Sequence, residues 1–119
     1  MHEISLVRNI FRTLEDEFPG EMERIRCIHL TVGELSNVQP ILMQNAFKAV
    51  LEDEPLYQQA SLHVEVLPVL IHCDDCNINV QVHHYKFVCT CGKPSRHIIQ
   101  GEELLISKVE FADEIQLNQ

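Results

Sequence analysis

The chain has 119 residues, of which 45% are hydrophobic, and its nine basic and 18 acidic residues give a formal net charge of −9. This length is enough for one domain, or for a small domain with a metal-stabilised insertion. The absence of a long apolar run excludes a membrane span. The acidic balance argues against a nucleic-acid partner, because phosphate binding depends on an excess of Lys and Arg.

The first predicted element is a helix over residues 2–18. Its apolar side chains recur at steps of three and four, which places them on one face. They are Ile4, Val7, Phe11, Leu14 and Phe18. Pro19 and Gly20 then end the helix. No basic stretch leads into an apolar run at the start of the chain, so we expect no signal peptide and a cytoplasmic location that keeps thiols reduced.

A half-buried strand is predicted to end at Gly33, because apolar and polar residues alternate before it. The apolar members are Ile28, Leu30 and Val32. Cys27 lies at the start of this stretch and is interpreted as a small apolar filler. A role for Cys27 as a metal ligand is the less favoured alternative, since the other four cysteines lie far away in the sequence.

A second helix is predicted to begin at Pro40, where the missing N–H of proline costs nothing. Its inner face is formed by Met43, Ala46, Phe47, Ala49, Val50 and Leu51. Residues 52–55 end it, and a second strand follows over residues 62–66, with Pro68 at its exit. A third strand over residues 104–111 can direct alternate side chains toward the helices, namely Leu105, Val109 and Phe111.

These elements predict an α+β fold. Because isolated strands need partners, the last strand is expected to return to the sheet of the first two. We therefore predict a small mixed sheet of about three strands with two helices, plus an inserted zinc-ribbon-like module. Residues 1–70 and 101–119 would form the α+β domain, and residues 71–100 the inserted zinc-binding domain.

Four of the five cysteines gather within twenty residues of one another, as two close pairs separated by a polar loop. They are Cys73, Cys76, Cys89 and Cys91. Such a pattern is typical of one structural Zn²⁺ held by four thiolates, which leaves no open position for water. The first pair is a regular C-x-x-C. The second is one residue shorter, so its backbone must turn more tightly, and Gly92 is expected to supply a positive φ angle.

A disulfide framework and a redox pair are the two alternatives for these cysteines. The expected reducing compartment argues against disulfides. A redox C-x-x-C usually opens a helix after a strand, whereas residues 77–82 alternate like a strand. The polar loop over residues 77–88 can also form a hairpin.

The start of the chain carries a second candidate metal site. Met1 and His2 offer a terminal amine, an amide nitrogen and an imidazole, and Glu3 can add its amide nitrogen or carboxylate. When the His2 amide is deprotonated, its nitrogen, the amine and the imidazole lie in one plane, which Ni²⁺ and Cu²⁺ prefer. The large His2 side chain is expected to prevent removal of Met1. A mobile surface histidine is the alternative for His2.

Four stretches of the chain together resemble the HypA/HybF family of hydrogenase maturation nickel chaperones. They are residues 1–7 (MHEISLV), residues 32–36 (VGELS), the paired cysteines and residues 101–104 (GEEL). The resemblance implies that Ni²⁺ binds to the Met1 amine, His2 and Glu3, and that structural zinc is held by Cys73, Cys76, Cys89 and Cys91. It also implies that the chain passes nickel, together with a nickel-handling GTPase, toward the large subunit of a [NiFe]-hydrogenase.

The second cysteine pair departs from the family pattern, which has C-x-x-C at both positions. This departure leaves the fourth zinc ligand open between Cys91 and a nearby histidine. The candidate histidines are His72, His83, His84 and His97. Thiolate is the better zinc donor, so Cys91 is favoured.

Two other functions are alternatives to nickel transfer. A zinc-ribbon adaptor or nucleic-acid binder is conceivable through Lys86, Lys93 and Arg96, although the overall charge opposes it. An enzyme is not predicted, because no catalytic triad order, phosphate loop or open zinc site is visible, and Asp74 and Asp75 fit a turn better than an acid–base pair. A homodimer is one oligomeric state that the sequence leaves open.

Overall fold

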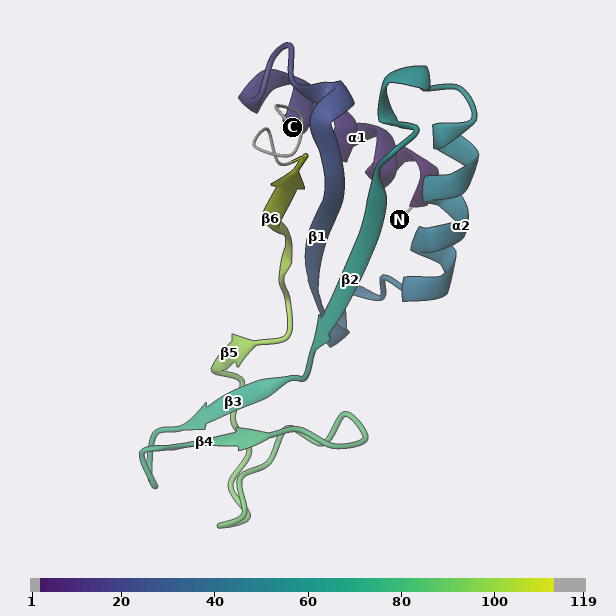
Figure 1. Cartoon of the computed structure of the whole chain (residues 1–119). Helices are drawn as coiled ribbons and strands as arrows, with labels where there is room; N and C mark the ends of the chain where they lie inside the picture. The colour runs from purple at the N-terminus through teal and green to yellow at the C-terminus, as the bar shows by residue number, and fades with distance from the viewer. Residues whose placement is uncertain (1–2, 113–119) are drawn as a thin grey trace. The chain divides into compact units, whose positions relative to one another are not determined.

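The structure, a computed structural model, describes residues 3–112. Two helices, six strands and three short 3-10 helices occur in this part of the chain (Figure 1). In chain order they are α1 (Glu3–Glu17), η1 (Met22–Arg24), β1 (Ile25–Gly33), η2 (Glu34–Ser36), α2 (Pro40–Leu51), η3 (Pro55–Tyr57), β2 (Ser61–Leu67), β3 (Leu70–Cys73), β4 (Ile78–Gln81), β5 (Ile98–Gln100) and β6 (Leu104–Phe111). The strands form two sheets, with orders β2-β1-β6 and β4-β3-β5. The predicted α+β class and the return of the last strand to the first sheet are confirmed.

Packing divides the chain into two compact units. Within the described residues, the first unit comprises the chain up to Leu30, Val38–Glu65, and the chain from Ile106 onward. The second comprises Thr31–Asn37 and Val66–Leu105, a wider segment than the insertion predicted over residues 71–100. The assignment of a nickel-binding and a zinc-binding domain to separate stretches stays a prediction, because packing alone defines these units.

In the first unit, both helices lie on one side of the β2-β1-β6 sheet (Figure 1). The buried face of α1 is formed by Val7, Ile10, Phe11 and Leu14. Ile4, which the sequence placed on this face, is 39% exposed, and Ile10 takes its place in the core. Ile4 lies in the first turn of α1, before the first buried position, Val7. Pro40 begins α2 as predicted.

Tyr57 completes this core and was not identified from the sequence. It is 1% exposed, and its ring stacks on Phe11 with 4.0 Å between centroids. Its hydroxyl lies 3.1 Å from a carboxylate oxygen of Glu15, to which it donates a hydrogen bond. Burial, together with this hydrogen bond, raises the pKa of Tyr57, so the hydroxyl stays protonated and keeps its donor role.

The second unit has a small hydrophobic core around β3. Its buried members are Val69, Ile71 and Val82, and Leu35, Val80, Phe87 and Ile98 pack against them. The strand predicted over residues 77–82 is present as β4, which pairs antiparallel with β3 from Leu70 opposite Gln81 to Cys73 opposite Ile78. Sequence patterns missed β3 and β5, because neither LIHC in β3 nor IIQ in β5 alternates between apolar and polar residues.

Two of the stretches that carried the family resemblance meet inside the second unit. The amide of Gly33 donates to the carbonyl of Glu103 at 2.7 Å, and the amide of Leu35 donates to the carbonyl of Gly101 at 2.8 Å. The backbones approach so closely that a Cβ added at Gly33 would lie 2.0 Å from the carbonyl carbon and oxygen of Gly101. Only glycine therefore fits at position 33.

Replacing Gly33 with alanine is accordingly expected to destabilise the protein by about 3 kcal/mol, because the backbone around Gly101 must move to accept a methyl group. Gly20→Ala is the matched control. Gly20 has a φ of +80° but open space around it, so Gly20→Ala should lower the free energy of unfolding by only about 1 kcal/mol. Urea unfolding of both variants measures the difference, and equal stabilities would contradict the close approach.

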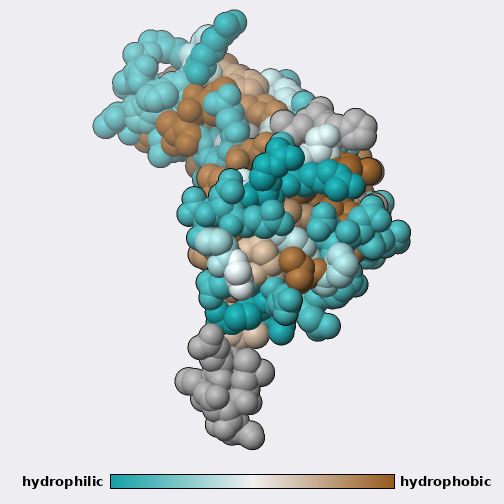
Figure 2. Space-filling model, turned by 90° about the horizontal axis from the view of Figure 1, so that it is seen from above, coloured by the Kyte–Doolittle hydropathy of each residue, from teal (hydrophilic) through white to brown (hydrophobic). Residues whose placement is uncertain are grey.

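The surface agrees with the acidic composition of the chain. Figure 2 shows mostly hydrophilic side chains on the face that it draws, with hydrophobic residues between them in small groups. The most exposed large hydrophobic residues of the described chain, Ile41 and Tyr85, are each 69% exposed. Single exposed apolar residues of this kind are normal on protein surfaces.

Candidate metal centre

The second unit brings all four paired cysteines into one cluster, formed by Cys73, Cys76, Cys89 and Cys91. Their sulfur atoms all lie within 4.8 Å of one another. The Sγ atoms of Cys73 and Cys91 are 3.9 Å apart, and those of Cys76 and Cys89 are 4.0 Å apart. Four sulfurs around a tetrahedral Zn²⁺, with Zn–S of about 2.3 Å, are separated by about 3.8 Å. The cluster therefore has the spacing that such an ion requires.

The first cysteine pair is positioned by the end of β3 and the turn that follows it. Cys73 is the last residue of β3, and its carbonyl accepts a hydrogen bond from the amide of Asn77 at 2.7 Å. Asn77 adopts a left-handed conformation with φ of 53°, which returns the chain into β4. This tight turn places Cys76 next to Cys73.

The second pair accommodates its missing residue through a tight turn. The amide of Gly92 donates to the carbonyl of Cys89, and the amide of Cys89 donates to the carbonyl of Lys93, both at 2.9 Å. Gly92 has a φ of +93°, which confirms the predicted positive angle. With the turn closed in this way, Cys91 reaches the cluster despite the C-x-C spacing.

All five cysteines of the chain are free, so the structure contains no disulfide framework. Cys73 and Cys89 are buried, whereas Cys76 and Cys91 are exposed. Hydrogen bonds among the thiols, led by the one with Cys91, raise the pKa of Cys76, whereas the backbone amide of Cys91 lowers the pKa of Cys89. A divalent cation that binds the four thiolates replaces their protons.

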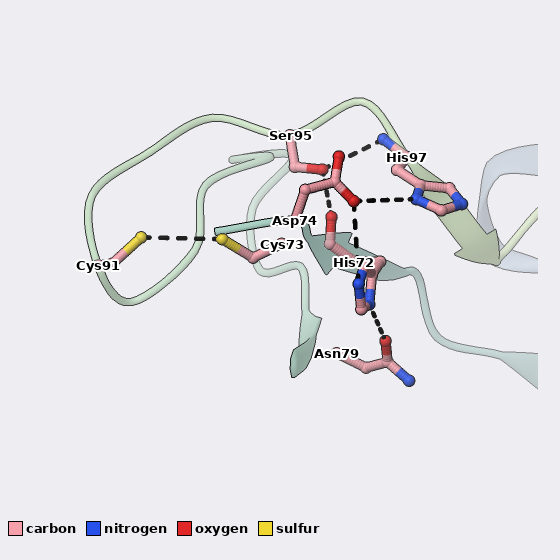
Figure 3. A network of polar contacts seen from close by, with 7 residues as sticks. All are labelled: His72, Cys73, Asp74, Asn79, Cys91, Ser95 and His97. Atoms are coloured by element: carbon pink, nitrogen blue, oxygen red, sulfur yellow. Dashed lines mark hydrogen bonds and ion pairs between the residues drawn. The ribbon is translucent and has the colours of Figure 1, made fainter. Parts of the chain in front are cut away.

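The histidines that were alternatives to Cys91 lie outside the four-sulfur cluster. Figure 3 shows His72 and His97 on either side of Asp74. The Asp74 carboxylate oxygen Oδ1 lies 3.9 Å from His72 Nε2 and 3.8 Å from His97 Nδ1. His72 Nδ1 also lies 2.8 Å from Asn79 Oδ1. These contacts support Cys91 as the fourth zinc ligand, although the ligand set itself stays a prediction.

His83 and His84 occupy a separate turn of the second unit. His83 forms an isolated bridge with Lys86, and His84 has a φ of 55°. Both histidines are exposed. Both histidines therefore lie in the polar loop over residues 77–88, for which the sequence predicted a hairpin.

Lys93, one of the basic residues near the cysteines, is paired with an acidic side chain. The Lys93 ammonium lies 2.6 Å from the Asp75 carboxylate, and this ion pair joins the two cysteine turns. Asp74 faces the two histidines (Figure 3). The role of Asp74 and Asp75 as turn residues was predicted. Their contacts with Lys93 and His97 were not, because these two residues come from a distant part of the chain.

The candidate nickel site falls mostly outside the described residues, since Met1 and His2 are not among them. Glu3 is described as the first residue of α1, and it is partly exposed. The N-terminal nickel site therefore stays a prediction. No helix of the described chain is long and apolar enough to cross a membrane.

Comparisons with known proteins agree on one family. The family model described as "Hydrogenase/urease nickel incorporation, metallochaperone, hypA" matches residues 1–111. A hydrogenase maturation factor HypA from Moorella thermoacetica is 34% identical, over 92% of this chain and 98% of the relative. A guanidine hydrolase-activating protein A from a Synechocystis species is 30% identical, over 92% of this chain and 94% of the relative. The solution structure of the Ni metallochaperone HypA from Helicobacter pylori has the same fold, with a TM-score of 0.63, 24% identity, and coverage of 94% of this chain and 98% of that one.

Proposed function

This chain belongs to the HypA family of metallochaperones for hydrogenase and urease nickel incorporation, and from this we propose that it binds Ni²⁺ at its N-terminus and delivers it to the large subunit of a [NiFe]-hydrogenase. The family is one of metal carriers and not of enzymes. The observation that carries the proposal is the extent of the family match, which includes both the first residues and the cysteine cluster.

The proposed nickel ligands are the Met1 amine, the amide and imidazole nitrogens of His2, and Glu3. Nitrogen donors in a plane suit Ni²⁺. Glu3 can contribute its carboxylate, or its amide nitrogen once that nitrogen has lost its proton, because the first amides of a helix make no hydrogen bond within the helix. The positive end of the α1 dipole opposes a bound cation, which limits affinity and favours release.

Zinc is proposed as the resident ion of the four-cysteine cluster, with Cys73, Cys76, Cys89 and Cys91 as its ligands. The free thiols and their spacing support this. A closed thiolate shell holds the ion throughout a transfer cycle and stabilises the fold around it. Nickel at the terminus, in contrast, can be released one ligand at a time as a recipient protein supplies its own donors.

The proposed partners are a nickel-handling GTPase and the hydrogenase large subunit, in the cytoplasm. A net charge of −9 favours recipients with a basic surface around the entry to the nickel site. The Synechocystis relative is named for activating a guanidine hydrolase, so a nickel enzyme other than hydrogenase is a second candidate recipient.

A transfer experiment tests the proposal. The protein is loaded with one equivalent of ⁶³Ni²⁺ and mixed with the GTPase and the metal-free large subunit, and the label on each protein is counted after separation. We expect the label to move to the large subunit faster than from free nickel buffered at the same concentration. Metal-free urease and guanidine hydrolase serve as parallel recipients. Label that stays on the chaperone with every recipient would contradict nickel delivery.

A further inference from the structure

The outer face of the first sheet carries a second group of metal-ligating side chains. Cys27 and His29 lie two residues apart on β1, so their side chains point to the same face. That face is opposite the one that buries Ile28 against the helices. Glu110 is on the neighbouring strand β6, and all these residues belong to the first unit. The four-cysteine cluster belongs to the other unit.

The donor atoms of Cys27, His29 and Glu110 converge. One sulfur, one ring nitrogen and one carboxylate oxygen all lie within 4.8 Å of one another. His29 Nε2 is 2.5 Å from Glu110 Oε1. The two strands are held together at this point, because the Ser107 hydroxyl donates to the His29 carbonyl at 3.2 Å.

The neighbouring side chains limit the rotation of His29 and leave the three donors partly exposed to solvent, as a ligand site requires. The His63 ring on β2 contacts the His29 ring edge to face, with 5.2 Å between centroids, and this contact limits rotation of His29. The side chains of His29 and Glu110 are 26% and 46% exposed. Cys27 is partly exposed as well, which corrects the expectation that it fills the core. An ion can therefore reach the three donors from solvent.

We propose that Cys27, His29 and Glu110 form a second binding site for a divalent ion of the zinc class, separate from the four-cysteine cluster and from the N-terminus. One thiolate, one imidazole and one carboxylate are a donor set that Zn²⁺ and Co²⁺ accept, whereas Ca²⁺ and Mg²⁺ require oxygen alone. Three protein ligands leave the fourth tetrahedral position to water, so this ion is exchangeable.

Binding requires one local change. Donors around a tetrahedral ion with metal–nitrogen and metal–oxygen distances of about 2.0 Å are separated by about 3.3 Å. The His29 and Glu110 atoms must therefore move apart by less than 1 Å, roughly, to admit the ion in place of their hydrogen bond. The exposed Glu110 side chain can make this movement without any shift of β6.

Cobalt titration tests the site, because a thiolate bound to Co²⁺ gives an intense near-ultraviolet absorption band. The protein is the full chain, with its four-cysteine cluster already loaded with zinc and with His2→Ala to remove the N-terminal site. We expect one equivalent of Co²⁺ to bind and to produce the band. The N-terminal ligands include no thiolate, so the outcome is independent of the nickel proposal.

Variants identify the ligands. Cys27→Ser should remove the band completely, and His29→Gln and Glu110→Gln should each weaken Co²⁺ binding at least tenfold. Glu65→Gln, which removes an exposed carboxylate from β2, is the matched control and should change binding less than twofold. Far-ultraviolet circular dichroism checks the folding of each variant. If Cys27→Ser does not fold, the weaker Co²⁺ binding of Glu110→Gln is the result that tests the site. Absence of the band in the parent protein, or its persistence in Cys27→Ser, would overturn the proposal.

Discussion

Replacing Cys91 with serine is expected to release zinc and to unfold the second unit. The hydrophobic cluster around β3 buries only Val69, Ile71 and Val82, which is too little to stabilise the segment Val66–Leu105 alone. A four-thiolate zinc site contributes something on the order of 10 kcal/mol to the folding of such a module. Loss of one thiolate should weaken zinc binding at least about 100-fold, since even the removal of groups outside the ligand shell costs 10–100-fold.

Two measurements follow the loss of Cys91. Zinc content is measured in the presence of a chelator that does not remove zinc from the parent protein. Amide resonances in a proton–nitrogen correlation spectrum should lose their dispersion for residues 66–105 and keep it for the helices α1 and α2. His97→Gln and His72→Gln are the matched controls, and both should retain zinc. Retained zinc in Cys91→Ser, with loss in His97→Gln, would mean that a histidine is the fourth ligand.

Replacing His2 with alanine is expected to lower nickel affinity by more than about 100-fold while zinc stays bound. The change removes the imidazole and the chelate ring that it closes, so the remaining amine and amide hold Ni²⁺ weakly. The measurement is a nickel titration by calorimetry, with zinc content determined on the same sample. Both the parent protein and the His2→Ala variant carry Cys27→Ser in this measurement, because the second site proposed above can also bind nickel.

The nickel site should also release its ion in acid. A terminal amine titrates near ~8 and an unperturbed histidine near ~6.5, so protons compete with nickel below these values. Affinity should therefore fall as the pH drops below 8, and more steeply below 6.5.

The matched control for His2→Ala is His84→Ala, which removes an exposed histidine from the second unit and should leave nickel affinity unchanged. Unchanged nickel affinity in His2→Ala itself would count against the terminal site.

The sequence predicted the elements with clear periodicity. Both helices, β1, β2, β4 and β6 were expected near their observed positions, and so was the clustering of the cysteines in one module. Helical periodicity and alternation of apolar and polar residues are the patterns that predicted these elements. The positive φ of Gly92 was also predictable, because a short cysteine turn leaves few other conformations.

Features that depend on contacts between distant parts of the chain were not predicted. The strands β3 and β5 have four and three residues, and their pairing decides their structure. Leu105 was expected to face the helices of the first unit, yet it is 46% exposed and belongs to the second unit. The approach of Glu110 to Cys27 and His29 follows from the register of β6 beside β1, which no local pattern reports.

The central claim is that the N-terminus of the chain binds nickel, while the cysteine thiolates of the second unit bind zinc. Its most direct test is a calorimetric nickel titration of the zinc-loaded Cys27→Ser protein in two forms, one with a free Met1 amine and one with that amine acetylated. We predict one equivalent of tightly bound nickel for the free form and at least a hundredfold weaker binding for the acetylated form, with equal zinc in both. Equal nickel affinity in the two forms would contradict this account.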